Sequence, residues 1–218
     1  SKSGTCLMPH QVDAVRWMLK RESIRKSNGD HKTGPLGGIL ADDMGLGKTL
    51  QTICLLLGNR HSKSLIIVPA NLIAQWKSEI NRFAPDIKVV DTVDEHTEDT
   101  VLILSYIKAI RSSYVREYDW NRIILDEAHY IRNAKGTVHK GLLQLKSQKR
   151  WCLTGTPIQN YKSDICSLLA FLGIRKKKYT HLDKYIEKYL LRRTKKALNI
   201  NMPSLTEHVD KVTSSPQE

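Results

Sequence analysis

The chain has 218 residues, 40% of them hydrophobic, which is enough to bury the core of one large domain or two small ones. Lysine and arginine (35) outnumber aspartate and glutamate (22), and the formal net charge of +13 favours a polyanionic partner, either nucleic acid or an acidic membrane surface. Because the sequence contains neither an apolar run long enough to cross a bilayer nor a signal-peptide pattern at its start, we predict an intracellular protein that does not enter a membrane.

The cysteines Cys6, Cys54, Cys152 and Cys166 stand far apart and form no C-x-x-C pair. This spacing argues against a zinc site and against a disulfide framework, so ordinary buried thiols are expected. The chain starts at Ser1 without an initiator methionine and ends in a polar stretch, from which we expect a piece of a longer protein.

The first predicted element is an amphipathic helix over residues 9–24, followed by an exposed polar loop over residues 26–35. Beyond this loop, short runs that are apolar throughout alternate with helix-like segments. Such runs are typical of strands covered on both faces, so the alternation predicts a parallel sheet wrapped by helices. The predicted strands are residues 38–41, 65–68, 87–90, 101–104, 123–125 and 151–153. The predicted helices between them are residues 49–57, 72–83, 106–110 and 138–145.

In such sheets, ligands bind outside the carboxyl ends of the strands, and the first strand is followed by the string D-D-M-G-L-G-K-T. Glycines let backbone N–H groups curl around phosphate oxygens, Lys48 supplies a positive charge to the β and γ phosphates, and the Thr49 hydroxyl can ligate Mg²⁺. The string departs from the usual phosphate-loop pattern because Asp42 occupies the position of the first glycine. The residues predicted to bind nucleotide here are Asp43, Met44, Gly45, Leu46, Gly47, Lys48 and Thr49.

A pair of carboxylates, Asp126 and Glu127, follows the strand at residues 123–125. Asp126 is predicted to hold magnesium, and Glu127 to orient and deprotonate the attacking water. Taken alone, the D-E-A-H string is also compatible with a solvated helix start whose acids complement the helix dipole, but its pairing with the phosphate loop favours a nucleotide site. His129 is either a coupling residue bonded to the next motif or a packed histidine.

A hydroxyl-rich loop comes after the strand at residues 151–153, with Thr154, Gly155 and Thr156 as candidate coupling residues. Each residue alone fits a plain turn. The order of phosphate loop, acid pair and hydroxyl-rich loop, each after a strand, is the order that a nucleotide-driven motor core requires.

The motifs together resemble those of the SWI/SNF-related ATPases, a branch of helicase superfamily two. The resemblance covers most of the chain, and the spelling of residues 38–49 is closest to the repair and transcription-termination translocases. It is carried by L-M-P-H-Q at residues 7–11 with Trp17, G-G-I-L-A-D-D-M-G-L-G-K-T at residues 37–49, I-I-V-P-A-N-L at residues 66–72 with Gln75 and Trp76, L-S-Y at residues 104–106, D-E-A-H, L-T-G-T-P-I-Q-N at residues 153–160 and L-L-R-R-T-K at residues 190–195.

The resemblance implies an α/β fold, namely one RecA-like lobe of the P-loop NTPases with a mostly parallel sheet, helices on both faces and a C-terminal helical extension. It implies that Gln11 reads the adenine edge. It also implies contacts with the DNA backbone, for which the candidate residues are Asn71, Lys77, Ser105, Arg192 and Arg193. The expected divisions are a helix and linker with the adenine motif (residues 1–36), an ATP-binding core (37–160) and a helical, basic extension toward a second lobe (161–218).

Some features depart from the family's pattern. Met8 stands where a basic residue is usual, the segment 161–190 is short, and nothing after Lys196 resembles the second lobe with its arginines for the γ-phosphate. Since an arginine supplied in trans is worth about a thousandfold or more in rate, the isolated chain is expected to bind ATP and to hydrolyse it poorly.

The resulting prediction is an enzyme that uses ATP and Mg²⁺ to translocate on double-stranded DNA, remodelling chromatin or displacing bound proteins. Its expected partners are duplex DNA, nucleosomes or other DNA-bound proteins, and the second lobe.

Basic clusters at residues 175–178 and 192–196 are either solvated faces or sites of phosphate contact or nuclear targeting. The absence of an aromatic platform favours duplex DNA over single strands. The protein is expected in the nucleus of a eukaryotic cell and otherwise in the cytoplasm.

Two alternative functions are considered. The first is a strand-separating helicase of the same superfamily, which the T-G-T-P-I-Q-N spelling disfavours. The second is a non-hydrolysing nucleotide-binding or DNA-binding module. Lys48, Asp126 and Glu127 argue against the second of these. A metal-dependent hydrolase is more distant, because no further ligand cluster is visible.

Overall fold

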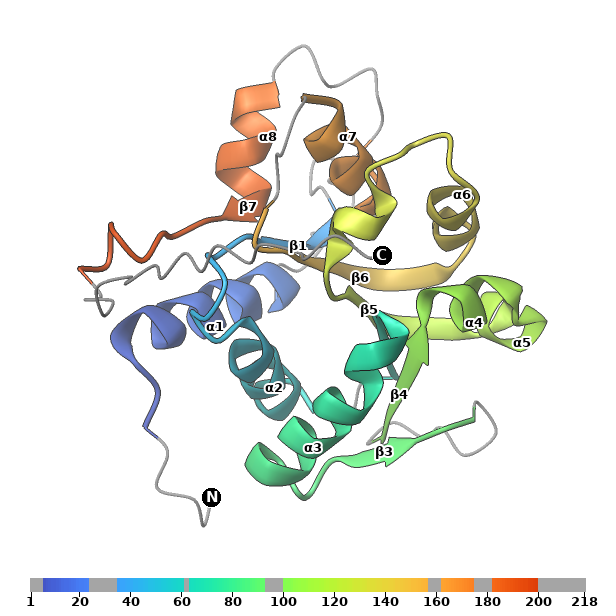
Figure 1. Ribbon diagram of the computed structural model, residues 1–218, viewed down its shortest axis with the longest axis horizontal. Helices are drawn as coiled ribbons and strands as arrows, with labels where there is room; N and C mark the ends of the chain where they lie inside the picture. Colours follow the sequence, from blue (N-terminus) through green and yellow to red (C-terminus); the bar gives the residue numbers. More distant parts are fainter. Residues whose placement is uncertain are drawn as a thin grey trace, which may run out of the picture.

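A computed structural model describes residues 6–23, 35–60, 63–92, 100–156, 162–174 and 182–199. Within these ranges the chain forms one sheet of seven strands in the order β3-β4-β2-β5-β6-β1-β7 (Figure 1). All neighbouring strands pair in parallel, as the alternation of strand and helix predicts. The strands are β1 (Leu36–Leu40), β2 (Ser64–Val68), β3 (Lys88–Val90), β4 (Thr100–Ser105), β5 (Asp119–Leu125), β6 (Lys146–Leu153) and β7 (Leu190–Leu191).

The helices alternate with these strands along the chain. They are α1 (Pro9–Ser23), α2 (Lys48–Gly58), α3 (Ile73–Phe83), α4 (Tyr106–Arg111), α5 (Ser113–Glu117), α6 (Thr137–Leu143), α7 (Lys162–Phe171) and α8 (Leu182–Tyr189), with short 3-10 turns η1 (Ala70–Leu72) and η2 (Ala128–Ile131). The predicted strands and helices are all present, with ends that differ by a few residues. The short helix α5, the 3-10 turns and the edge strand β7 were not foreseen.

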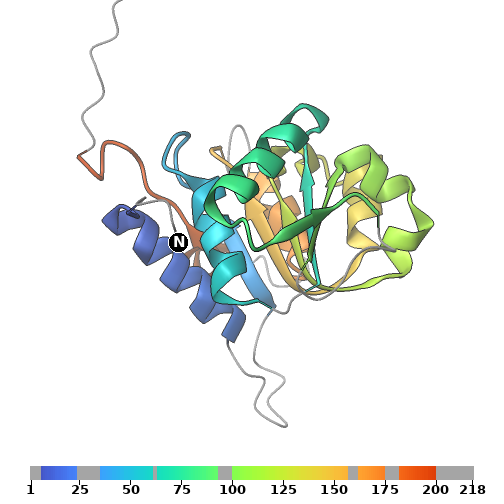
Figure 2. The same ribbon diagram turned by 90° about the horizontal axis from the view of Figure 1, so that it is seen from below.

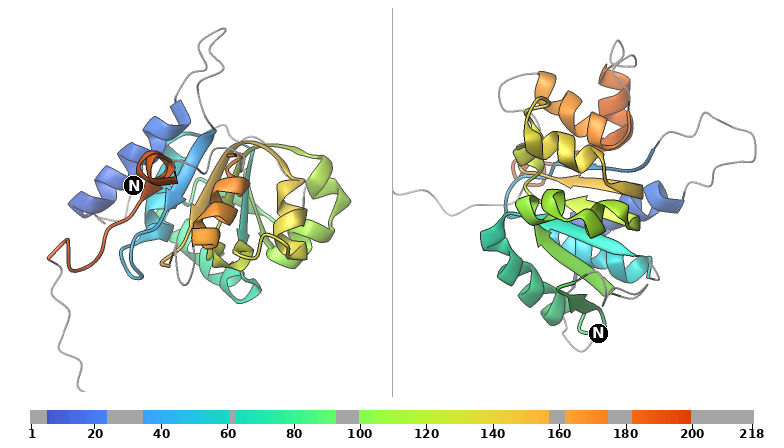
Figure 3. Two further views of the ribbon diagram at one scale, coloured as in Figure 1. Left: turned by 90° about the horizontal axis from the view of Figure 1, so that it is seen from above. Right: turned by 90° about the vertical axis from the view of Figure 1, so that its right-hand side faces the viewer.

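Helices cover both faces of the sheet, which confirms the layered fold. Alternate residues of one strand enter opposite cores: Ile39 belongs to the cluster beneath α4 to α8, and Leu40 to the cluster beneath α1, α2 and α3. Figure 3 shows α6, α7 and α8 on one side of the sheet and α2 and α3 on the other. This double burial explains why the strands are apolar throughout instead of alternating with polar residues.

Close packing against β1 fixes the position of helix α1 on the sheet. A Cβ atom on Gly38 would lie 2.7 Å from the Trp17 ring, so only glycine lets this tryptophan lie on the strand. The ring of Trp17 packs edge to face on Trp151 with centroids 5.5 Å apart. Nearer the end of the helix, Arg21 donates from Nε to the carbonyl of Gly37 at 2.9 Å.

A buried ionic cluster anchors the last turn of α1 to the sheet. The carboxylate of Glu22 accepts hydrogen bonds from Nε of Arg122 at 2.6 Å and from Nε1 of Trp151 at 2.8 Å. The Arg122 and Glu22 side chains are both fully buried, and Lys149 lies 3.5 Å from the same carboxylate. Arg122 also donates to Oγ of Ser64 at 2.9 Å. Since β2, β5, β6 and α1 all contribute, the cluster joins four elements.

The cysteines are free thiols, but only one is fully buried. Cys152 lies in the core, Cys54 and Cys166 are half-buried, and Cys6 is exposed. The prediction of buried thiols is therefore wrong for Cys6, which precedes the first helix. Within the described ranges, no helix has the length and apolar character needed to cross a bilayer.

Candidate nucleotide site

The loop between β1 and α2 has the geometry of a phosphate-binding loop. Gly45 and Gly47 have φ values of 85° and 83°, in the left-handed region where residues with a side chain are strained. A Cβ atom on Gly47 would also lie 2.4 Å from Nε2 of Gln11, so glycine is needed for space as well. The loop leads directly into the N-terminus of α2, whose free N–H groups and dipole favour an anion.

Lys48 begins α2 and turns its ammonium group back over the loop. Nζ donates to the carbonyl oxygens of Asp42 at 2.7 Å and Asp43 at 3.2 Å. Burial lowers the pKa of Lys48, and the negative charge of Glu127, followed by those of Asp42 and Asp126, partly offsets this effect. Because β5, β6 and β1 are neighbouring parallel strands, the acid pair after β5 and the loop after β1 lie at the same edge of the sheet.

Asp126 follows β5 and is held from several sides. Its Oδ2 accepts from Nε1 of Trp76 at 2.7 Å, and its Oδ1 accepts from the backbone N–H of Glu127 at 2.9 Å. Tyr106 donates to the carbonyl of Asp126 at 2.7 Å. Burial raises the pKa of Asp126, and the Trp76 and Glu127 hydrogen bonds oppose that shift. The carboxylate therefore has one fixed orientation.

Glu127 adopts an uncommon backbone conformation, with φ of 48° and ψ of 49°. A non-glycine residue in the left-handed region costs about 1–3 kcal/mol and is often found at functional sites. Oε2 of Glu127 lies 3.0 Å from Nδ1 of His129. His129 thus contacts the acid pair itself, and its ring also packs against Tyr130 at a centroid distance of 5.0 Å.

The hydroxyl-rich loop after β6 lies over the phosphate loop. The N–H of Thr154 donates to the carbonyl of Leu40, at the end of β1, at 3.1 Å. A Cβ atom on Gly155 would lie 2.8 Å from Cγ of Met44 and 3.8 Å from Nζ of Lys48. Three strand ends therefore bring the phosphate loop, the acid pair and residues 154–156 together.

Arg132, which the sequence analysis did not single out, bridges two of these segments. It follows η2 and donates from Nη2 to Oγ1 of Thr156 at 2.7 Å and also to the Thr156 carbonyl. Among the residues that the structure describes, Arg132 joins the D-E-A-H segment to residues 154–156 by hydrogen bonds, whereas His129 contacts Glu127 of its own segment. No local sequence pattern marks it. Residues 157–160 of the predicted motif lie outside the described residues.

The amino-acid sequence matches the sequence model of a known protein family. The model of the SNF2-related domain matches residues 10–178. The chain belongs to the SNF2-related domain family. It is 33% identical over 186 residues to the "Probable global transactivator" of Orgyia pseudotsugata multicapsid polyhedrosis virus, and 35% identical over 185 residues to the ISWI chromatin-remodeling complex ATPase ISW1 of Saccharomyces cerevisiae. These alignments cover 78% and 76% of this chain.

The chain spans only part of the length of these SNF2-related proteins, namely 36% of the viral relative and 16% of the yeast relative. A solved structure described as the Sulfolobus solfataricus SWI2/SNF2 ATPase core in complex with dsDNA superposes with a TM-score of 0.74 at 30% identity. The match covers 91% of this chain and 47% of the archaeal one. The chain therefore has the fold of part of an SNF2-family ATPase core.

The residue expected to read adenine, Gln11, lies on the first turn of α1 against the phosphate loop. Its Nε2 donates to the Leu46 carbonyl at 3.3 Å, and its Oε1 accepts from the N–H of Met8 at 3.0 Å. Gln51, on α2, donates to the same Leu46 carbonyl at 2.9 Å. This SNF2-related chain thus holds the apex of the loop from two helices.

The candidate DNA-binding residues occupy different environments. Asn71 and Arg192 are exposed, and Ser105 caps α4 by accepting from the N–H of Lys108 at 3.3 Å. Lys77 pairs with the exposed Asp91 at 2.6 Å. Arg193 turns inward and pairs with Asp42, so its guanidinium does not extend to solvent as a DNA contact would require. The basic cluster at residues 175–178 lies outside the described residues.

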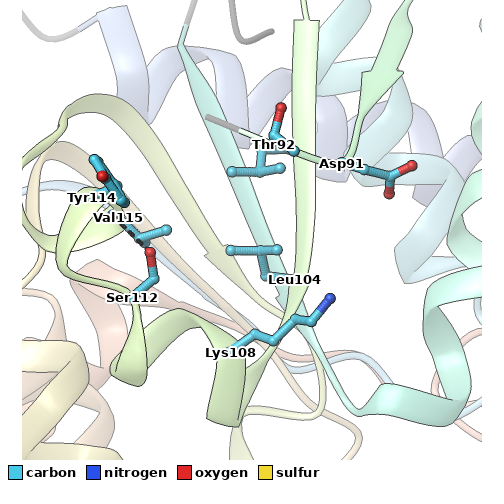
Figure 4. A pocket seen from close by; sticks show the side chains of 8 residues that line it. Asp91, Thr92, Leu104, Lys108, Ser112, Tyr114 and Val115 are labelled. Atoms are coloured by element: carbon cyan, nitrogen blue, oxygen red, sulfur yellow. Dashed lines mark hydrogen bonds between the residues drawn. The ribbon is translucent and has the colours of Figure 1, made fainter. Parts of the chain in front are cut away.

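A separate pocket of about 370 Å³ opens beside β4, α4 and α5 (Figure 4). Its polar lining includes Asp91, Lys108 and Ser112, and its apolar lining includes Leu104 and Val115. Ser112 accepts from the N–H of Val115 at 3.3 Å and so caps α5. None of the residues predicted to bind nucleotide lines this pocket, so it is distinct from the candidate nucleotide site.

Proposed function

We propose that the chain is the ATP-binding first lobe of a DNA-dependent ATPase that translocates on double-stranded DNA. The observation that carries the proposal is the convergence of Lys48, Asp126, Glu127 and Gly155 on one edge of the sheet, where the parallel strands β1, β5 and β6 end. The fold likeness to an SWI2/SNF2 core in complex with duplex DNA supports the choice of substrate. Residues 37–160 would form the core of this lobe, with residues 1–36 before it and 161–218 leading toward a second lobe.

The nucleotide would bind with its phosphates at the N-terminus of α2. There the loop N–H groups and Lys48 would meet the β and γ phosphates, and the Lys48 ammonium would exchange the carbonyls of Asp42 and Asp43 for phosphate oxygens. Gln11 would recognise the adenine edge from the start of α1. The lowered pKa of Lys48 reflects burial, and a bound anion would favour its charged form.

The oxygen donors of this site suit Mg²⁺. The Thr49 hydroxyl at the start of α2 and the oriented Asp126 carboxylate after β5 are hard oxygen ligands, and bound magnesium would neutralise charge that develops on the phosphates. Glu127 would accept a proton from the water that attacks the γ-phosphorus while the bond to the ADP oxygen breaks, giving ADP and phosphate. Arg132 joins Thr156 to the segment that carries the acid pair. The coupling residues Thr154, Gly155 and Thr156 would change their conformation with the state of the bound phosphates.

The DNA contacts in this proposal are made to phosphates. Asn71 follows β2 and Ser105 ends β4, at the same edge of the sheet, whereas Lys77 lies on α3. Arg192 follows β7 and is exposed. A motor that moves along any sequence needs contacts to the backbone and not to base edges. The net charge of +13 provides the attractive field. In a eukaryotic cell such a protein would act in the nucleus, on DNA or nucleosomes, and otherwise in the cytoplasm.

Duplex DNA is expected to stimulate ATP hydrolysis by the longer protein that contains both lobes, by about tenfold or more, whereas this chain alone hydrolyses ATP slowly. The reason is that the second lobe is expected to supply the arginines that stabilise the transition state. Steady-state hydrolysis would be compared with duplex, single-stranded and nucleosomal DNA. DNA affinity should also fall steeply between 50 and 200 mM salt because phosphate contacts dominate.

Two results would contradict this proposal. Stronger stimulation by single strands, together with strand displacement, would favour a strand-separating helicase. Equal turnover by this chain and the longer protein would show that the second lobe is not needed for hydrolysis.

A further inference from the structure

The segment that follows the last strand runs beside the phosphate loop. The N–H of Ala41 donates to the carbonyl of Leu191 at 2.7 Å, and the N–H of Asp43 donates to the carbonyl of Arg193 at 3.0 Å. The N–H of Lys195 in turn donates to Oδ2 of Asp43 at 3.1 Å. Figure 2 shows this segment, in orange, leaving the sheet beside α1. Residues 191–195 are therefore joined to the start of the phosphate loop by two backbone–backbone hydrogen bonds and one bond to a side chain.

The side chain of Arg193 forms a forked ion pair with Asp42. Nε donates to Oδ1 at 2.9 Å, Nη2 donates to Oδ2, and the backbone N–H of Arg193 donates to Oδ1 at 3.1 Å. Nη1 also donates to the carbonyl of His10, on α1. Asp42 is completely buried and the Arg193 side chain is only 15% exposed. Paired forks of this kind combine charge with a fixed orientation.

The position of Asp42 makes this pair important for an anionic ligand. Asp42 occupies the first position of the phosphate-loop string, where the usual pattern has glycine, and its carbonyl accepts from Nζ of Lys48. Without Arg193, a buried carboxylate would be left beside the site for the phosphates, where it would repel them and attract the ammonium of Lys48. With Arg193, this charge is balanced and the start of the loop is held in place.

We propose that Arg193 is a positioning residue of the nucleotide site, which acts through Asp42 on the phosphate loop. The inference rests on the proposed binding of ATP. It gives Arg193 a role inside the lobe in place of the DNA contact expected from its basic cluster. It also explains how a loop that lacks its first glycine accommodates an acidic residue there.

The test compares the affinity of this chain for Mg²⁺–ATP in matched variants, by calorimetric titration at a temperature where circular dichroism shows each variant to be folded. Arg193→Gln is expected to weaken binding about tenfold or more. Adding Asp42→Asn to Arg193→Gln is expected to restore most of the affinity, because the uncompensated charge is removed. Arg16→Gln, which removes an exposed arginine with a side chain 77% accessible to solvent, is the control and should bind ATP as the unchanged chain does.

Each outcome bears on the proposal. Unchanged affinity in Arg193→Gln would overturn it. A loss of affinity that Asp42→Asn does not repair would also overturn it, because that loss would show that Arg193 stabilises the structure and does not act by balancing the charge of Asp42. If Arg193→Gln does not fold, Arg193→Lys keeps the charge without the fork, and it should bind ATP several-fold more weakly. Unchanged binding by Arg193→Lys would then overturn the role of the fork. Failure of the unchanged chain to bind ATP would overturn the proposed function and this inference together.

Discussion

Glu127→Gln is expected to reduce ATP hydrolysis by about a hundredfold or more while leaving ATP affinity within a few-fold of its original value. The amide has nearly the shape of the carboxylate but cannot accept a proton from water, and general bases contribute about 10²–10⁴ in rate. The two carboxylates have different partners: that of Asp126 accepts from Trp76 and from the Glu127 N–H, and that of Glu127 lies beside His129. The two acids therefore have separable tasks.

The measurement is single-turnover hydrolysis by the protein that contains both lobes, together with ATP titration of this chain. Glu117→Gln is the matched control, because Glu117 is an exposed acid at the end of α5. Retention of more than about a tenth of the turnover by Glu127→Gln would rule out Glu127 as the general base. Loss of ATP binding would instead assign it a role in holding the nucleotide.

Glu22→Gln is expected to lower the free energy of unfolding by about 3 kcal/mol, since removing one partner of a buried ion pair leaves the other charge uncompensated. Arg122 is fully buried, and Lys149 adds a second positive charge at the same place. For a chain of this size, the melting temperature should fall by about 10 °C. Urea unfolding followed by circular dichroism gives the measurement.

The control for this prediction is Asp13→Asn, which breaks an exposed pair with Arg16 at 3.8 Å and should change the free energy of unfolding by less than about 1 kcal/mol. A loss in Glu22→Gln no larger than that of the control would contradict the prediction. ATP affinity is a useful second readout, because the same helix that Glu22 anchors carries Gln11 against the phosphate loop.

The contribution of Glu22 should also depend on pH. Burial acts to raise the pKa of Glu22, but the hydrogen bond and charge of Arg122, with Lys149 and Trp151, outweigh it and leave the pKa lowered. A carboxyl group whose pKa is lower in the folded state stabilises that state above its unfolded pKa, and this stabilisation is lost as the pH falls through the folded pKa. The difference in stability between the unchanged chain and Glu22→Gln should therefore shrink below about pH 4.

The sequence by itself determined the class of the fold and the segments that meet at the candidate site. Strands covered on both faces are apolar throughout, and the glycines around Lys48 follow one of them, so a local pattern was enough to predict a parallel sheet with a phosphate loop. The place of Asp126 and Glu127 after β5 followed from the same rule, because parallel strands end at one edge.

Only the tertiary structure decided which side chains hold this site together. Arg193 lies 151 residues from Asp42, and Arg122 lies 100 residues from Glu22, so no spacing along the chain connects the members of either pair. A basic cluster looks the same in a sequence whether an arginine faces DNA or a buried acid. Edge strand β7 has only two residues and no pattern of its own, and its pairing with β1 is what turns Arg193 toward the phosphate loop. The direction of a side chain depends on the elements packed around it, and this information is not local.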